Sequence, residues 1–457
     1  MNIIITIAVT AFIVLYAGLF KAKKSVLPLT LVGLLVALGF AACSWNEETT
    51  YFTMMRMDNF ALAFSVITMV GTLFIFLLTP RYFAEDSPNI AEYFTLILFS
   101  LCGMIIMVSY QNLSMLFIGI EIMSVSLYIL AGIRKLNFAS NEASLKYFLM
   151  GAFSTGFLLF GIALIYGATG SFDIAVIQQY LVNNVHTVSP LFYPGIILIL
   201  IGLCFKVGAA PFHFWTPDVY EGAPTLITTF MATVVKTAGF AAFLRLFAGA
   251  FEPLHDFWTP AVMVIIVLTL CIGNITALFQ KNFKRLLAYS SISHAGYLLF
   301  SIVVLTANSG SNVLVYAAAY TFATIIAFGV LILVKQQTGS ELIDSFNGLG
   351  KKNPMAATAL TIAMLSLAGI PLTAGFIGKY VMFLNVMESY RTTLVVIAIL
   401  NALVGFYYYF KVIIAVWFKT EGDIVLNTPL SYKVVLVLSA FVTLLLGIYP
   451  TLILNLI

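Results

Sequence analysis

Hydrophobic residues form long, nearly uninterrupted runs along the whole chain, and short polar segments separate them. A run of about 20 apolar residues is long enough to cross the hydrocarbon core of a bilayer as an α-helix. The sequence lacks the shorter segments of alternating hydrophobicity that a membrane β-barrel needs. The pattern therefore predicts an all-α polytopic membrane protein with about 14 transmembrane helices. The predicted spans are residues 3–20, 25–43, 58–79, 90–109, 112–133, 143–167, 189–210, 224–249, 257–280, 284–305, 311–336, 354–388, 391–418 and 430–455.

The segments between the spans are short, so no soluble domain is expected. The longest, residues 168–188, contains FDIAVIQQYLV, which predicts a short helix at the membrane surface. The first apolar run begins at Asn2, with no positively charged region before it and no small-residue cleavage site after it. It is therefore predicted to remain as the first helix and not to be a cleaved signal peptide.

Two of the predicted spans contain residues that interrupt a helix. The region 354–388 is longer than one straight span requires, and its middle reads AGIPLTAGF, in which Pro371 removes a backbone donor. In span 7 the stretch GLCFKVGAAPFHFWTPDVYEGAP places Gly208 and Pro211 directly after a run of apolar residues. Irregular backbone at membrane depth is tolerated where it is buried in protein or lines a cavity. Spans 7 and 12 are therefore predicted to be broken helices.

The two predicted breaks lie five spans apart, which suggests duplicated halves. Secondary transporters are often built from inverted repeats whose broken helices meet at the functional site. Because five is an odd number, two consecutive five-helix units insert with opposite topology, so spans 4–8 and 9–13 are predicted to be inverted repeats. The predicted units are an N-terminal three-helix segment, a first repeat, a second repeat and a C-terminal helix, at residues 1–89, 90–249, 250–418 and 419–457.

Composition excludes several classes of protein. Of the 457 residues 62% are hydrophobic and only 9% are charged, whereas soluble domains are roughly 25% charged. There is no basic run suited to nucleic acid. The cysteines are Cys43, Cys102, Cys204 and Cys271; they are scattered through apolar spans without the clustering of a metal or iron–sulfur site, and are predicted to be small core residues.

The positive charges are distributed unevenly between the two sides of the predicted bundle. Fifteen Lys and Arg residues lie in odd-numbered loops and two, Arg56 and Arg391, in even-numbered loops. By the positive-inside rule the odd-numbered loops are cytoplasmic, so both termini are predicted on the periplasmic side. The fifteen residues are Lys21, Lys23, Lys24, Arg81, Arg134, Lys135, Lys146, Lys281, Lys284, Arg285, Lys335, Lys351, Lys352, Lys419 and Lys433.

The remaining basic residues lie within predicted spans, where a charge is costly. A charged side chain at the centre of a membrane helix costs roughly 2.5–3.5 kcal/mol on insertion scales. Arg245 and Lys411 lie toward the ends of their spans and are interpreted mainly as snorkelling or helix-packing residues. Lys411 follows FYYYF, whose tyrosines are candidates for cation–π contact. Lys206, Lys236 and Lys379 are the functional candidates.

One acidic residue, Glu121, lies deep in a span. It shares a helical face with Ser114, Ser124 and Tyr128 at spacings of 7, 3 and 4 residues. The acid therefore lies on a polar stripe and is a candidate functional group. The alternative is that it only pairs with a neighbouring helix.

Lys236 and His294 also lie on polar stripes at the centres of their spans. Threonines at positions 229, 233 and 237 accompany Lys236 on one face, and Ser290, Tyr297 and Ser301 accompany His294. The unperturbed pKa of histidine, about 6.5, suits proton relay. A buried histidine is equally often a satisfied core residue, so this alternative stays open for His294.

Bond-making chemistry is not indicated, because the sequence shows no Ser/His/Asp set, no carboxylate pair and no phosphate-binding loop. The titratable groups Glu121, Lys206, Lys236, His294 and Lys379 instead extend from one predicted repeat to the other. Such a chain favours proton movement. A Glu121–Lys206 pair would hold the lysine charged while closed and favour proton release when open. Moving one charge against 100 mV costs about 2.3 kcal/mol, which a change of pairing can supply.

Three stretches resemble a known family. GLCFKVGAAPFHFWTPDVYEGAPT, KRLLAYSSISHAGYLL and SLAGIPLTAGFIGKY are similar to the antiporter-like membrane subunits of respiratory complex I. The motif FHFWTPDVYEGAP resembles the subunit N branch of that family more than the L and M branches or the Mrp antiporters. The resemblance covers about residues 60–440.

The resemblance implies a fourteen-helix fold with inverted repeats at spans 4–8 and 9–13. It also implies a glutamate in span 5 paired with a lysine in span 7, a central lysine in span 8 and a lysine in the broken span 12. These positions match Glu121, Lys206, Lys236 and Lys379, and the family's linking histidine region matches His294.

The function implied is that of a proton-translocating subunit of a bacterial NADH-quinone oxidoreductase in the inner membrane. The NAD, FMN, iron–sulfur and quinone sites are expected in other subunits, so this chain should hold no cofactor and no metal. The expected partners are the other membrane-arm subunits, the lipid bilayer, protons and water, with no nucleic acid. The alternatives are an Mrp-type or stand-alone cation/proton antiporter, and a chain that only scaffolds the membrane arm.

Overall fold

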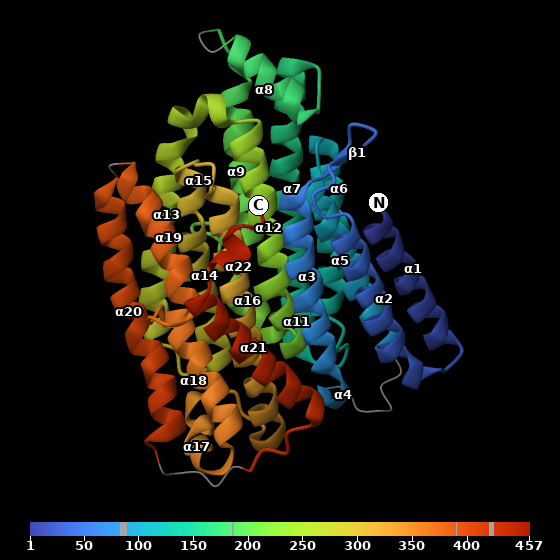
Figure 1. Cartoon of the computed structure of the whole chain (residues 1–457), viewed down its shortest axis with the longest axis vertical. Helices are drawn as coiled ribbons and strands as arrows, with labels where there is room; N and C mark the ends of the chain where they lie inside the picture. Colours follow the sequence, from blue (N-terminus) through green and yellow to red (C-terminus); the bar gives the residue numbers. More distant parts are fainter. Residues whose placement is uncertain (83–88, 185–186, 390, 420–424) are drawn as a thin grey trace.

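The chain forms a bundle of helices whose long axes run roughly side by side (Figure 1). The computed structural model describes residues 1–82, 89–184, 187–389, 391–419 and 425–457. Within this part, twelve helices are long and apolar enough to cross a membrane. They are α1 (Asn2–Leu19), α2 (Lys23–Cys43), α3 (Asn59–Leu77), α5 (Ile90–Ser109), α6 (Leu113–Ala131), α7 (Phe138–Thr169), the continuous α11 (Thr225–Phe230), η1 (Met231–Val235) and α12 (Lys236–Gly249), then η2 (Glu252–Leu254) with α13 (His255–Leu278), α14 (Phe283–Leu298) with α15 (Phe300–Val303), α16 (Ser309–Thr338), α20 (Thr392–Trp417) and α21 (Leu430–Ile448).

Two shorter apolar helices, each followed by a second helix after a break, account for the remaining predicted spans. Helix α9 (Phe192–Val207) ends where Gly208 adopts φ +72°, and α10 (Trp215–Gly222) follows it. Helix α18 (Pro354–Ala368) ends where Gly369 adopts φ +87°, and α19 (Ala374–Glu388) follows it. The predicted all-α membrane fold with broken spans 7 and 12 is therefore confirmed.

The helices of the two halves pack in the same order. In the first half α5 packs against α6, and α7 packs against both α9 and α10. In the second half α13 packs against α14, and α16 packs against both α18 and α19. This parallel order agrees with a duplicated arrangement. The predicted unit boundary at residues 89 and 90 adjoins residues 83–88, which lie outside the described residues.

Smaller elements connect the long helices. The short helix expected in residues 168–188 is present as α8 (Ile174–Asn183), and the Asp173 carboxylate caps its first turn. A two-stranded hairpin of β1 (Thr49–Tyr51) and β2 (Met55–Met57) follows α2 and was not expected. The other short elements are α4 (Thr79–Tyr82), η3 (Ile343–Phe346), α17 (Leu349–Lys352) and α22 (Thr451–Leu454). Both chain ends lie toward the same end of the bundle, the upper one in Figure 1.

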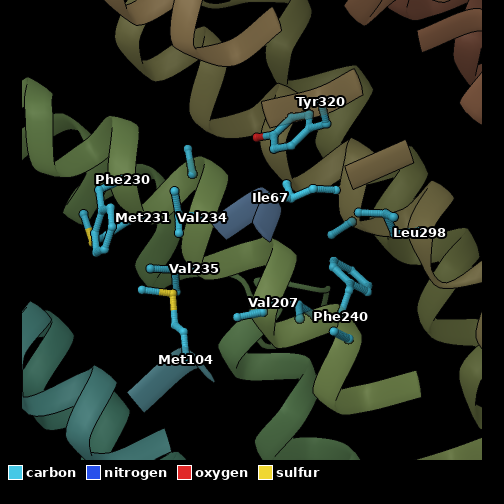
Figure 2. Packing of buried hydrophobic residues seen from close by; sticks show 14 of the residues in the cluster. Ile67, Met104, Val207, Phe230, Met231, Val234, Val235, Phe240, Leu298 and Tyr320 are labelled. Atoms are coloured by element: carbon cyan, nitrogen blue, oxygen red, sulfur yellow. The ribbon is translucent and has the colours of Figure 1, made fainter. Parts of the chain in front are cut away.

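The interior of the bundle is formed by the helices that carry the central polar residues. In the most apolar 18-residue stretch of α11–α12, and in that of α16, every residue is buried. In the corresponding stretch of α14–α15, 94% of the residues are buried. Figure 2 shows the packing beside α12, where Val207, Met231, Val235 and Phe240 lie in one apolar cluster. In α1, α2, α7, α20 and α21 less than half of the corresponding stretch is buried. Lys236 and His294 are therefore carried by interior helices.

The break between α18 and α19 depends on glycine at position 369. Besides its positive φ, a Cβ on Gly369 would lie 2.9 Å from Cδ and 3.2 Å from Nζ of Lys379. Gly369→Ala should therefore destabilise the protein by about 1–2 kcal/mol from the backbone alone, because a left-handed conformation is unfavourable for a residue with a Cβ. The measurement is the heat-denaturation midpoint of the purified protein in its native assembly.

A matched control is Gly156→Ala in α7, where a Cβ would meet no heavy atom within 4 Å. Because alanine is the better helix former, this substitution should leave the midpoint unchanged or raise it slightly. Equal midpoints for the two variants would contradict the role given to Gly369.

Candidate functional site

Lys206 lies in the last turn of α9 and contacts α6. Its side chain is 6% exposed, and its ammonium donates to Ser124 Oγ at 3.0 Å and to Tyr128 OH at 3.5 Å. Among the ion pairs of the described residues, none joins Lys206 to Glu121. The Glu121 Oε1 atom is buried and has no hydrogen-bond partner in that part of the chain. Lys206 is therefore held by Ser124, one helical turn after Glu121 on α6, and not by an ion pair with Glu121 among the described residues.

The break after Lys206 is held by aromatic side chains. Trp215 Nε1 donates at 3.0 Å to the carbonyl of Phe205, which also accepts from the backbone N–H of Gly208 at 3.1 Å. The Trp215 ring stacks on Tyr147 at 4.7 Å, and Tyr147 meets the Tyr128 ring edge-on at 4.8 Å. His213 is 6% exposed, and its Nδ1 has no partner among the described residues. The segment after the break thus packs back onto the surroundings of Lys206.

Lys236 begins α12 immediately after the π-helical turn η1. Such a turn interrupts the regular hydrogen-bond ladder and occurs frequently at functional sites. The Lys236 side chain is 2% exposed, and its ammonium donates a short hydrogen bond to the backbone carbonyl of Ser291 on α14. This contact joins the first half of the bundle to the second.

The threonine stripe predicted beside Lys236 is buried but serves its own helix. The hydroxyls of Thr229, Thr233 and Thr237 each donate to the backbone carbonyl four residues earlier, at 2.8, 2.6 and 3.1 Å. The Thr237 hydroxyl also lies 3.2 Å from that of Thr321 on α16. The stripe therefore supplies acceptor oxygens but few free donors around Lys236.

His294 lies between two tyrosines from other helices. Its Nδ1 is 2.7 Å from the hydroxyl of Tyr316 on α16, and its Nε2 is 3.0 Å from that of Tyr409 on α20. The Tyr409 hydroxyl is also hydrogen-bonded to Ser290, one turn before the histidine. Both ring nitrogens thus have hydroxyl partners, each of which can donate or accept a proton.

Lys379 lies in α19 and reaches back across the helix break. Its ammonium donates to the carbonyls of Leu367 and Ala368 at 3.0 and 2.8 Å, at the end of α18. It also lies 4.9 Å from the centre of the Tyr297 ring on α14, a distance suited to cation–π contact. The break therefore provides the oxygens that hold this buried cation.

Helix α14 connects three of the predicted site residues. Its Ser291 accepts from Lys236, its His294 binds two tyrosines, and its Tyr297 faces Lys379. Lys206 and Glu121 lie apart from this group, on α9 and α6. Among the described residues, no hydrogen bond joins Lys206 to Lys236.

The two end-of-span cations have specific partners. Arg245 is 11% exposed and forms an ion pair with Asp58, at 2.5 Å between Nη2 and Oδ1. Its guanidinium lies 4.9 Å from the centre of the Phe60 ring. Lys411 donates at 3.3 Å to the carbonyl of Gln280, just beyond α13. Both are helix-packing contacts; the Arg245–Asp58 pair has no sequence signal, because the two residues are 187 positions apart.

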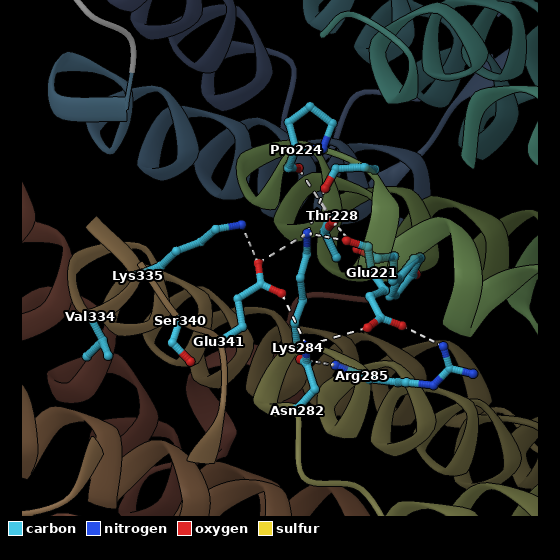
Figure 3. Close-up of polar contacts among 12 residues, drawn as sticks. Glu221, Pro224, Thr228, Asn282, Lys284, Arg285, Val334, Lys335, Ser340 and Glu341 are labelled. Carbon is cyan, nitrogen blue, oxygen red and sulfur yellow. Dashed lines mark hydrogen bonds and ion pairs between the residues drawn. The ribbon is translucent and has the colours of Figure 1, made fainter. Parts of the chain in front are cut away.

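A network of ion pairs that the sequence did not reveal lies where α10 meets the start of α14 (Figure 3). Lys284, counted above among the cations of the odd-numbered loops, is the second residue of α14 and is only 1% exposed. It lies 3.9 Å from Glu341, which forms a 2.6 Å ion pair with Lys335. Beside it, Arg285 pairs with Glu221 at 2.5 Å. The network joins both halves of the bundle.

Glu341 remains ionised in this network. It follows the end of α16 and lies outside the membrane-spanning segments. Burial alone would raise the pKa of the Glu341 carboxyl, but the positive charges of Lys284 and Lys335 outweigh this effect and lower that pKa below its ordinary value.

Comparison with known proteins identifies the family. Residues 110–405 match the NADH:quinone oxidoreductase/Mrp antiporter transmembrane family. NADH-quinone oxidoreductase subunit N of Cytophaga hutchinsonii is 42% identical over 457 residues, covering 100% of this chain and 99% of the relative. That of Flavobacterium psychrophilum is 41% identical over 458 residues and is covered completely, as is this chain. The chain belongs to the NADH-quinone oxidoreductase subunit N family.

A chain of a solved respiratory complex I structure shares the fold. A chain of respiratory complex I from Thermus thermophilus with bound Aureothin superposes with a TM-score of 0.86 at 33% identity, covering 99% of this chain and 98% of that one. The matched family includes both oxidoreductase subunits and Mrp antiporters, so it does not by itself distinguish an oxidoreductase subunit from an antiporter. The full-length relatives do, and they confirm a multi-pass membrane subunit of a bacterial NADH-quinone oxidoreductase.

Metal ligands are not grouped in the described part of this subunit N chain. No set of three or more His, Cys, Asp and Glu side chains there could hold a metal ion. Cys43, Cys102, Cys204 and Cys271 are free thiols in the structure.

Tyr409→Phe should destabilise subunit N within the purified complex. The change removes one hydroxyl that serves both the buried Ser290 and the buried His294, and an unsatisfied buried polar group costs about 1–3 kcal/mol. Tyr407→Phe is the matched control, because Tyr407 is 66% exposed. The measurement is the temperature at which subunit N unfolds in the complex; an equal temperature for both variants would show that the Tyr409 hydroxyl does not hold the histidine.

Proposed function

We propose that this subunit translocates protons across the membrane through Glu121, Lys206, Lys236, His294 and Lys379. Electron transfer from NADH to quinone in other subunits, which would hold the FMN and iron–sulfur clusters, supplies the driving force. The chain itself moves protons and performs no redox chemistry. The comparisons support the general activity through the family, and the assignment of these five residues rests on the geometry.

The observation that carries the proposal is the way the three buried lysines are held. Lys206, Lys236 and Lys379 are each at most 7% exposed, and their ammonium groups are bound by hydroxyls and backbone carbonyls. Within the described residues, none of them forms an ion pair with a carboxylate within 4.0 Å. No fixed counter-ion therefore locks these lysines in the charged form, as a structural salt bridge would. Placing such costly groups at membrane depth is typical of a proton relay.

The contacts along α14 support a route between the two central lysines. Lys236 binds this helix at Ser291, His294 follows three residues later, and Lys379 lies over Tyr297 three residues further. His294 and its hydroxyl partners supply groups that both accept and donate protons. We propose that His294 passes protons between Lys236 and Lys379.

Buried polar atoms without partners support an uptake route from the end of the bundle that is predicted to be cytoplasmic. The side-chain oxygens of Thr216, Tyr220, Thr225, Ser291 and Thr324 are buried and unpaired within the described residues. They come from α10, α11, α14 and α16, the elements around Lys236. Buried polar atoms of this kind are usually satisfied by ordered water. We propose that they line a hydrated route to Lys236.

Glu121 and Lys206 would act as a switchable pair. Lys206 binds Ser124, which lies three residues after Glu121 on the same helix, so a side-chain movement suffices to bring the two charges together. A pair that closes and opens changes the affinity of Lys206 for its proton. In the proposed cycle, closure holds the proton and opening releases it.

The repeats and the orientation complete the proposal. Residues 90–249 and 250–418 are proposed to act as two inverted proton-transfer units between the segment 1–89 and the C-terminal helix in 419–457. Both termini are proposed to lie on the periplasmic side, in line with the distribution of Lys and Arg. Other membrane-arm subunits and lipid would cover the remaining faces.

Lys236→Met and Lys206→Met should each reduce proton pumping by the assembled oxidoreductase by about tenfold, which corresponds to ~1.4 kcal/mol in the barrier. Methionine preserves most of the side-chain volume but cannot carry a proton. The measurement is the initial rate of NADH-driven acidification in inside-out vesicles. Lys433→Met is the control, because Lys433 is exposed on α21.

Normal pumping together with normal quinone reduction in both variants would remove these lysines from the mechanism. Sodium-dependent transport by the isolated chain would instead favour an independent antiporter.

The orientation is tested by reporter fusions after Ile457 and within the exposed residues Lys351 and Lys352 of α17. Alkaline phosphatase, which requires export for activity, should be active at the C-terminus and inactive in α17. A fluorescent protein that folds in the cytoplasm should give the reverse pattern. An active phosphatase at α17 would invert the proposed orientation.

A further inference from the structure

Two lysines cross between the halves of the bundle in opposite directions. Lys236 of the first half donates to the backbone carbonyl of Ser291 in the second. Lys284 of the second half donates to the backbone carbonyls of Glu221 and Ala223 in the first, at 2.9 and 2.6 Å. Each lysine therefore binds the main chain, and not a mobile side chain, of the opposite half.

The carbonyls bound by Lys284 belong to the corner between α10 and α11. Helix α10 ends at Gly222 and α11 begins at Thr225, so carbonyls at this corner lack helical partners. A cation at a helix C-terminus also interacts favourably with the helix dipole. Lys284 thus fixes a corner that leads directly into the helix carrying Lys236.

Lys284 is itself held by the second half. Its charge lies 3.9 Å from Glu341, and the backbone carbonyl of Glu341 accepts from Phe283 N at 2.8 Å. The side-chain amide of Asn282 lies 3.4 Å from the same carboxylate and caps α14 through Arg285 N. The base of α14 therefore has little freedom, and the lysine extends from it as a fixed arm (Figure 3).

Lys284 and the acceptor of Lys236 are located on the same face of α14. Lys284 and Ser291 are seven residues apart, which is two helical turns and about 10 Å. Helix α14 therefore meets the α10–α12 segment at two levels, the corner and Lys236. A displacement at the corner between α10 and α11 moves the start of α11. It therefore also moves α12, the helix that carries Lys236.

We propose that Lys284 is a positioning residue for proton transfer at Lys236. By holding the corner at Glu221 and Ala223, it sets the distance between Lys236 and the groups on α14. Proton transfer requires hydrogen-bond distances, and a misplacement of about 1 Å can cost as much as a hundredfold in rate. The inference rests on the proposed role of Lys236.

The test uses the complete oxidoreductase with Lys284→Met, Lys284→Arg and Lys236→Met. Lys284→Met should leave the complex assembled, reduce proton pumping about tenfold, corresponding to ~1.4 kcal/mol, and accelerate hydrogen–deuterium exchange of the backbone in residues 221–225. Lys284→Arg keeps the charge and the donors, so it should restore at least half of the lost rate. Lys351→Met, an exposed lysine in α17, is the control and should change neither quantity.

Each remaining outcome has a defined meaning. If Lys236→Met impairs pumping but Lys284→Met does not, the positioning role is wrong and the proposed function stands. If Lys236→Met pumps normally, the proposed function fails. If Lys284→Met prevents assembly, Glu341→Gln replaces it. That change removes the charge that holds Lys284 at the base of α14, so it should accelerate exchange at 221–225 and reduce pumping in the same direction. Failure of both variants to assemble, or unchanged exchange at 221–225 with reduced pumping, would overturn the positioning role.

Discussion

The structure depends on how a positive charge is accommodated inside a membrane protein without a negative one beside it. A charged side chain in hydrocarbon is costly, and an isolated ammonium must recover its lost hydration from neutral oxygens. Here Lys379 uses carbonyls that the end of α18 leaves free, Lys236 uses a carbonyl of a neighbouring helix, and Lys206 uses a serine and a tyrosine. The break between α18 and α19 is thus part of the solvation of Lys379.

This form of solvation explains why the interior helices are arranged around α14. A backbone carbonyl can bind a lysine only if its helix is held at a fixed distance, and α14 is fixed at its base by Asn282, Lys284 and Glu341. Further along, the same helix supplies Ser291, His294 and Tyr297. The ion network at the base of α14 and the groups proposed for proton transfer further along are therefore connected by one rigid helix.

The sequence predicted the features that are local along the chain. Hydrophobic runs gave the spans, Gly208 and Gly369 marked the breaks, and charged residues in apolar surroundings marked the site. The partners of those charges were not predictable, because a carbonyl acceptor such as that of Ser291 has no sequence signature. The burial of Lys284 was not predictable either, because it arises from Glu221 and Glu341, about 60 residues away on either side.

The row formed by Ser290, Tyr409, His294 and Tyr316 has no intrinsic polarity. Every link in it joins a hydroxyl to a ring nitrogen or to another hydroxyl, and all of these groups can exchange the roles of donor and acceptor. Rotation of the hydroxyl hydrogens, together with a change of the His294 tautomer, reverses the whole row without moving a heavy atom. A proton flux through this row, as proposed above, would therefore meet the same groups in either sense, and a proton gradient that drives electrons backward would require no second pathway.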